Sequence, residues 1–263
     1  ALPIVANALS EQTGVEVVLQ SGCATTAHTT DTVITLPMID SDSDSVDALW
    51  GLLFHETGHH IYTEFVHDLK AMVACLQSKP TYFQHCWNIL EDVRMESAVM
   101  ADFPGSRGYL TAAVTYMQKH GALEPVQADD PLPAIVGNWL LGRGRTKALG
   151  QSLDAVWQAS ESLLKAQFGD APIEEIGCMI DRAKDCETSM EVVDLVDDIF
   201  AAFRALLPDE EKPMVPPTPG TQGESEGEGE GGTDQQGEPA DDVPPTSTPS
   251  SDSGSGLSDG TAA

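Results

Sequence analysis

A single helical segment limits most strongly what this chain can fold into. Its apolar residues recur at the i, i+3, i+4 spacing of a buried helical stripe, which includes Leu49, Leu52 and Leu53. Within this apolar stretch stands the sequence His55-Glu-Thr-Gly-His59. Charged and imidazole side chains are costly in such surroundings unless they have partners, and Gly58 in mid-helix costs about 1 kcal/mol relative to alanine. The pattern therefore predicts a helix that carries a polar site and that a backbone segment or another helix approaches closely at Gly58.

His55 and His59 are four residues apart, so an α-helix places both imidazoles on one face. Two imidazole nitrogens at this separation can bind one Zn²⁺ at about 2.0–2.1 Å. Glu56 is rotated by roughly 100° from His55, so its carboxylate can reach a water on the metal without binding the metal itself. The spacing predicts a zinc site in which a metal-activated water attacks a carbonyl and Glu56 is the general base. A chance match in a surface helix is the alternative, and the apolar context disfavours it.

A third protein ligand is expected from a second helix, predicted from about Tyr82 to Met100. Glu91 lies 32 residues beyond His59, an interval that fits the end of one helix, a connection and the middle of the next. Its burial beside apolar neighbours is unfavourable unless it is ionised on a metal, so we predict Glu91 as the third ligand, with Asp92 as the alternative. Arg94 or Asp92 could orient a ligand. For Arg94 and Glu96 a structural ion pair is favoured over a direct catalytic role.

These two segments resemble a known family. Leu53-Phe-His-Glu-Thr-Gly-His59, the preceding Asp31 and Leu36-Pro37, and Asn88-Ile-Leu-Glu-Asp-Val-Arg-Met-Glu96 are similar to the metallopeptidase-like domain of CobT-like, cobaltochelatase-related bacterial and phage proteins. In that group an acidic low-complexity linker and a von Willebrand A domain follow, and no such domain or Asp-x-Ser-x-Ser motif is present in this sequence. The resemblance implies a zincin fold, with Glu91 as the gluzincin-like zinc ligand. It also implies that Thr32 to Leu36 is the sheet edge to which a peptide substrate adds.

Other polar side chains are candidates for supporting roles in the site. Amide cleavage needs a donor to the developing oxyanion, and the candidates by residue type are Tyr62, Arg107, Tyr109 and Tyr116. His60 points about 100° away from His59, so a packed or supporting role is favoured over ligation. The tryptophans are expected to anchor the core: Trp50, Trp87, Trp139 and Trp157.

The remaining pattern predicts an α+β fold that is mostly helical. Short β-rich segments at Val15–Leu19 and Thr32–Leu36 form a small N-terminal sheet. Helices are predicted at 107–120, 132–141, 151–167, 173–185 and 189–206, which completes a zincin-like domain over residues 1–207. Residues 208–263 hold 13 acidic residues against one lysine and are rich in Pro, Gly and Ser. Such a stretch cannot bury enough apolar surface to fold, so a disordered acidic tail or linker is predicted.

Charge limits the partners. The formal net charge of −29 disfavours nucleic acid and anionic membranes, which both require Lys and Arg. No signal peptide or membrane-spanning segment is visible, and the five cysteines form no C-x-x-C pair, so a cytoplasmic or virion-associated location is expected.

The leading hypothesis is a zinc metalloendopeptidase with a protein or peptide substrate. The alternative is a non-catalytic or chelatase-type assembly subunit that works with an AAA+ ATPase or a von Willebrand A-type partner, as the acidic tail and the resemblance imply. A self-processing protease is a third possibility.

Overall fold

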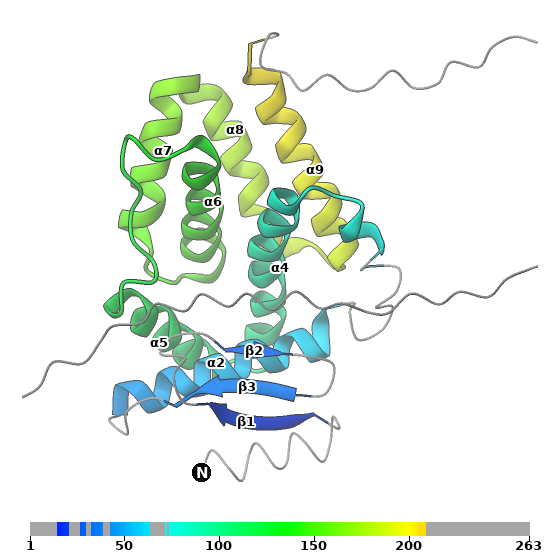
Figure 1. The fold of residues 1–263 in the computed structure, drawn as a ribbon, viewed down its shortest axis with the longest axis vertical. Helices are drawn as coiled ribbons and strands as arrows, with labels where there is room; N and C mark the ends of the chain where they lie inside the picture. Colours follow the sequence, from blue (N-terminus) through cyan, green and yellow to red (C-terminus); the bar gives the residue numbers. More distant parts are fainter. Residues whose placement is uncertain are drawn as a thin grey trace, which may run out of the picture. The chain divides into compact units, whose positions relative to one another are not determined.

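Three short strands form a sheet at the N-terminal end of the fold (Figure 1). The computed structural model describes residues 15–20, 27–29, 33–38, 43–63, 72 and 74–208, all within the first of two units, Ala1–Pro213. Strand β1 (Glu16–Gln20) pairs in parallel with β3 (Val33–Pro37), and β2 (His28–Thr29) pairs antiparallel with β3 on its other side. The described strands therefore have the order β1-β3-β2.

This order corrects the prediction that Thr32 to Leu36 is the edge of the sheet. The segment corresponds to β3, which is the central strand, because β2 covers its free side. A strand of two residues has no periodic pattern that would reveal it in the sequence. The edge on that side belongs instead to β2 among the described strands.

Helix α2 (Ser43–Tyr62) lies along the sheet and carries the stripe predicted above (Figure 1). Alternation along β3 buries Ile34 and Leu36, which pack in one apolar cluster with Leu52 and Leu53 of α2. Ala113 of α5 (Ser106–Lys119) belongs to the same cluster. Helix α2 is thus held between the sheet and α5, and its polar residues are fixed by apolar packing on either side.

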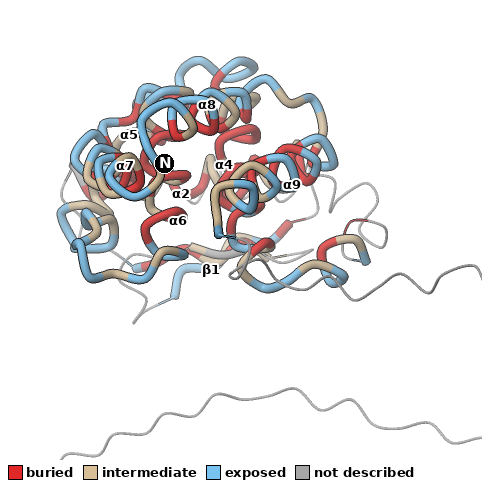
Figure 2. Tube along the Cα trace, turned by 90° about the horizontal axis from the view of Figure 1, so that it is seen from above, coloured by how far each residue is buried: buried red, intermediate tan, exposed pale blue. Residues whose placement is uncertain are grey.

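The second core surrounds α4 (Thr81–Asp102), a helix without internal Gly or Pro that is flanked by Pro80 and Pro104. Its buried face packs in one large cluster with the C-terminal helices, which Figure 2 shows with their buried sides turned inward. These helices are α6 (Leu132–Arg143), α7 (Asp154–Phe168), α8 (Asp170–Asp181) and α9 (Ser189–Leu206). Trp87 and Trp139 are buried in this core as predicted, whereas Trp50 and Trp157 are only partly buried.

The mostly helical α+β class is confirmed, and the predicted helices agree with the observed ones to within a few residues. Besides β2, two short elements were not predicted: a π-helix, η1 (Gly144–Leu149), and a 3-10 turn, η2 (Ala183–Asp185). Helix η1 ends at Gly150, whose φ of 74° favours glycine. None of the described helices is long and apolar enough to cross a lipid bilayer. The predicted acidic tail lies outside the described residues, apart from Pro208, and stays a prediction.

Candidate metal centre

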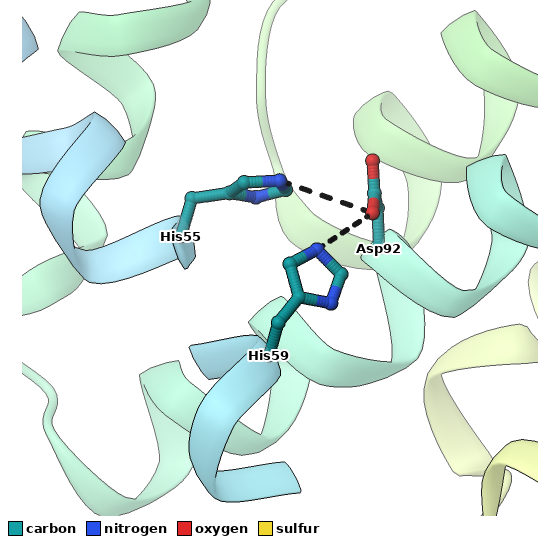
Figure 3. Close-up of side chains that lie close together, drawn as sticks. All are labelled: His55, His59 and Asp92. Atoms are coloured by element: carbon teal, nitrogen blue, oxygen red, sulfur yellow. Dashed lines mark ion pairs between the residues drawn. The ribbon is translucent and has the colours of Figure 1, made fainter. Parts of the chain in front are cut away.

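Helices α2 and α4 bring two imidazoles and one carboxylate together (Figure 3). His55 and His59 project from successive turns of α2, with their ring centroids 4.9 Å apart. Oδ1 of Asp92 on α4 lies 3.3 Å from Nε2 of His59 and 3.9 Å from Nε2 of His55. The expected pair of histidines is therefore joined by a carboxylate from the expected helix, and that carboxylate is Asp92.

Glu91, the predicted third ligand, does not reach the histidines. Its side chain is fully buried, and both carboxylate oxygens are occupied. Oε1 accepts from Arg94 Nη2 at 2.6 Å, Thr63 Oγ1 at 2.8 Å and Ser189 Oγ at 2.9 Å, and Oε2 accepts from Arg94 Nε at 2.8 Å. Neighbouring residues of a helix point about 100° apart, so when Asp92 faces α2, Glu91 faces elsewhere. The third-ligand assignment moves from Glu91 to the alternative, Asp92.

The second nitrogen of each histidine has a defined partner. Nδ1 of His55 lies 2.9 Å from Oε1 of Glu96, and Nδ1 of His59 lies 3.0 Å from Oγ1 of Thr63. Glu96 accepts as a carboxylate, and Thr63 uses its single proton to donate to Glu91. Both Nδ1 atoms must therefore be the donors. In the neutral imidazoles this leaves the Nε2 lone pairs directed toward Asp92, which is how metal-binding histidines are commonly oriented.

The geometry suits a small divalent cation. Ligands at about 2.0–2.2 Å from one tetrahedral zinc lie roughly 3.3–3.5 Å apart. The 3.3 Å from Asp92 Oδ1 to His59 Nε2 falls in this range, and the 3.9 Å to His55 Nε2 is a few tenths of an ångström longer. That oxygen is buried and accepts no hydrogen bond of good geometry from the described residues. A buried carboxylate oxygen without a donor is costly. His55, His59 and Asp92 can therefore hold a metal, with room in the coordination sphere for a further ligand.

Charge in the site is strongly coupled. Burial lowers the pKa of His55, but the carboxylates of Asp92 and Glu96 outweigh it and raise the pKa to about 9. Burial raises the pKa of Asp92 and of Glu96, but the nearby cationic groups, His55 and Arg145 among them, bring both to about 2. The two carboxyl groups are thus ionised near neutral pH. A bound divalent cation would take the place of the proton on His55.

Arg145 is a residue of the site that the sequence reasoning missed. Its Nη1 donates to Glu96 Oε1 at 2.8 Å and to Gln151 Oε1 at 3.0 Å, and its Nη2 lies 3.4 Å from Asp92 Oδ2. Gln151 Nε2 completes the network by donating to Glu96 Oε2 at 2.7 Å. Glu96 thus pairs with Arg145, while Arg94 pairs with Glu91. Arg145 lies in the π-helix η1, whose backbone departs from regular α-helical register, and no spacing rule in the sequence reveals its place in the site.

Gly58 permits the close approach of the two helices, as predicted. A Cβ atom at this position would overlap Sδ of Met95 and come within 2.8 Å of Cγ2 of Val99, both on α4. A larger residue would force the Met95 and Val99 side chains to shift or α4 to move away from α2. The glycine therefore lets α2 and α4 pack closely beside the histidines and Asp92.

Glu56 lies in the same site. It is buried, and it lines one cavity with His55, Asp92, Glu96 and Arg145. His60 is partly buried and does not belong to the His55–His59–Asp92 group.

The four oxyanion candidates do not line this cavity. Tyr62 donates to Asp102 at 2.6 Å, and burial together with that bond raises its pKa to about 12. Arg107 donates to the carbonyl of Leu149, Tyr109 stacks on Phe54, and Tyr116 lies against His120. Arg145 is the cationic donor that the cavity does contain.

Comparison of the chain with protein-family models, with curated proteins and with solved structures finds no match. The function therefore has to be argued from the geometry of the site.

Proposed function

We propose that this chain is a zinc-dependent peptidase of the zincin type. His55, His59 and Asp92 hold one Zn²⁺, and Glu56 is the general base. The observation that carries the proposal is the convergence of two oriented Nε2 atoms on the buried Asp92 Oδ1, in a cavity that Glu56 also lines. A histidine pair with a catalytic glutamate beside it is the arrangement expected for hydrolysis of a carbonyl compound by water.

The chain's own residues divide the work. When bound, zinc supplies the Lewis acidity that activates water and polarises the scissile carbonyl. Glu56 accepts a proton from the attacking water and returns it to the leaving amide nitrogen. Glu96 and Thr63 fix the two imidazole rings through their Nδ1 atoms. Arg145 holds Glu96 and lies beside Asp92, which keeps the carboxylates in place.

A peptide substrate would pair with the outer edge of β2. Ala27, which directly precedes β2, lines the cavity that contains His55 and Glu56. An extended chain added at this edge would run past the site with its backbone fixed by strand pairing. The strand that a peptide substrate would pair with is thus β2, which lies beside the cavity of the site, and not the segment from Thr32 to Leu36.

The test is hydrolysis of unfolded casein by the purified, zinc-loaded chain, with and without a chelator. We expect cleavage that the chelator abolishes and that zinc restores. Glu56→Gln should retain zinc but lose cleavage by about 100-fold or more, because proton transfer contributes on the order of 10²–10⁴. Glu174→Gln, which changes an exposed carboxylate on α8, is the matched control and should cleave normally. Unchanged cleavage by Glu56→Gln would refute the mechanism.

The alternative is a non-catalytic or chelatase-type assembly subunit, which the acidic segment 208–263 favours. It predicts zinc binding without hydrolysis, and capture of an AAA+ ATPase to the same extent by the wild type and by Glu56→Gln. Both proposed functions are compatible with the cytoplasmic or virion-associated location that the sequence predicts.

A further inference from the structure

The cavity beside the candidate metal centre has one polar and one apolar end. Its volume is about 170 Å³. The polar end is lined by two residues of the metal centre, His55 and Asp92, and by Glu56, Glu96 and Arg145. The apolar end is formed by Leu52 of α2 and by one face of α5. A substrate whose carbonyl lies at a metal held by His55 and His59 would therefore place a neighbouring group against α5.

The α5 wall consists of Leu110, Ala113, Val114 and Met117. These residues follow the i, i+3, i+4, i+7 spacing of a single helical face. The first three are buried, and Met117 at the end of the series is partly buried. The wall is therefore continuous and apolar, and Met117 is the member with most freedom to be changed without disturbing the core.

Gly51 fixes the distance between this wall and α2. A Cβ at Gly51 would overlap the carbonyl oxygen of Tyr109 and come within 2.8 Å of Cβ of Ala113. The glycine lets α5 lie directly against the helix that carries the histidines. Because α2 and α5 pack this closely, the α5 wall and the metal centre face the same small cavity.

We infer that the α5 wall is a specificity pocket that selects peptides with a medium-sized aliphatic side chain, of leucine or methionine size, next to the scissile bond. The inference rests on the proposed function. A cavity of roughly 150 Å³ lined by apolar side chains holds a benzene-sized group, and part of this cavity is taken up by the metal centre. A branched aliphatic side chain fills what is left, whereas a large aromatic one does not. A charged side chain would lose its hydration against the wall without gaining a partner.

The experiment measures binding rather than turnover. The probes are a series of peptide hydroxamates, which chelate zinc, carrying alanyl, leucyl, naphthylalanyl, aspartyl or lysyl side chains next to the hydroxamate. Their dissociation constants are measured by calorimetry on the zinc-loaded chain. We expect the leucyl probe to bind at least about 10-fold more tightly than the alanyl probe, since one methylene in an apolar pocket is worth roughly 10–200-fold. The aspartyl and lysyl probes should bind more weakly still.

Met117→Ala should widen the pocket and shift the preference toward the naphthylalanyl probe by about 10-fold. Met117→Phe should shift it toward the alanyl probe. Met179→Ala is the matched control, since Met179 is also a partly buried methionine but lies on α8 and does not line the cavity. It should leave the order of the probes unchanged.

The outcomes separate the two proposals. If every hydroxamate binds in a zinc-dependent way with the same affinity, or if Met117→Ala leaves the order unchanged, the pocket assignment is wrong while the metal centre stands. If the acidic probe binds best, Arg145 rather than the α5 wall selects the substrate, and the inference is overturned. If no probe binds and the chain takes up no zinc, both the proposed function and the pocket fail.

Discussion

Neutralising the two adjacent acidic residues of α4 should have opposite consequences. Asp92→Asn removes a proposed metal ligand that makes one long contact to Arg145 and faces the histidines. Glu91→Gln removes a carboxylate that binds no metal but is fully buried between Arg94, Thr63 and Ser189. The first change should chiefly weaken zinc binding, with a smaller loss of folding stability than the second. The second should weaken folding far more than it weakens zinc binding.

The magnitudes follow from the contacts. Glu91 is the carboxylate partner of a guanidinium that is only 4% exposed. Breaking such a pair by removing one charge costs about 3–5 kcal/mol, which is a large share of the roughly 5–15 kcal/mol that holds a domain together. Structural zinc sites with four ligands contribute about 10–16 kcal/mol, so one ligand accounts for roughly 2.5–4 kcal/mol. Asp92→Asn should therefore raise the zinc dissociation constant by about 100- to 1,000-fold.

Two measurements are needed. Zinc affinity is obtained by competition with a chromophoric chelator, and folding stability by urea unfolding of the metal-stripped protein. Glu91→Gln should lower zinc affinity by only about 10- to 100-fold, the effect of losing a group that supports a ligand. Glu174→Gln serves as the control for surface charge. Loss of zinc from Glu91→Gln, together with wild-type affinity in Asp92→Asn, would refute the ligand assignment.

Three further predictions concern the surroundings of the histidines. Gly58→Ala should lower the free energy of unfolding by up to about 2 kcal/mol, since overpacking costs about 1–3 kcal/mol and helix propensity returns about 1 kcal/mol. Adding Met95→Ala to this variant should restore part of the lost stability in urea unfolding. A Gly58→Ala protein that is more stable than the wild type would contradict the packing argument. Thr63→Val should weaken zinc binding by about 10- to 100-fold, because Nδ1 of His59 loses its hydrogen-bond acceptor. Thr63→Ser keeps the hydroxyl and should bind zinc as the wild type does. Both affinities are measured by chelator competition. In the metal-stripped protein, the raised pKa of His55 contributes stability that is complete below pH 6.5 and is lost as the pH rises toward about 9. The free energy of unfolding should therefore fall over this window by at most about 1.4 kcal/mol per pH unit, and the zinc affinity should rise. If neither the free energy of unfolding nor the zinc affinity changed with pH, the raised pKa of His55 would be wrong.

Much of the helical pattern could be predicted from the sequence, because long periodic segments are set locally. The helix that carries His55 and His59, the helix that brings an acidic residue beside them and the close approach at Gly58 all follow from spacing and from the cost of glycine in a helix. The choice between Glu91 and Asp92 could not be made in this way. Both are acidic, they are adjacent, and both have low exposure in the folded protein. Only the rotation of α4 about its axis, which its whole apolar face sets, decides which of them faces α2.

The residues missed from the sequence share a physical cause. Arg145, Gln151 and Ser189 reach the site or its supports from segments far along the chain, through contacts that no local period encodes. Arg145 lies in a π-helix, and β2 is a strand of only two residues. Such irregular elements are stabilised by tertiary contacts rather than by propensity, so they become visible only when the fold is assembled.

The supports of the metal centre connect the two cores of the fold. His59 donates to Thr63, Thr63 donates to Glu91, and Glu91 accepts from Ser189 at the start of α9. Glu91 was expected to bind the metal, and it instead connects Thr63, which directly follows α2, to Ser189 of α9. Because hydrogen-bonded groups in such a buried chain orient one another, holding His59 on a metal also holds the Thr63–Glu91–Ser189 connection. If the proposed zinc site is correct, zinc should therefore stabilise the junction between α2, α4 and α9 as well as the site itself. The same buried connection accounts for an acidic residue at position 91 that does not reach the histidines.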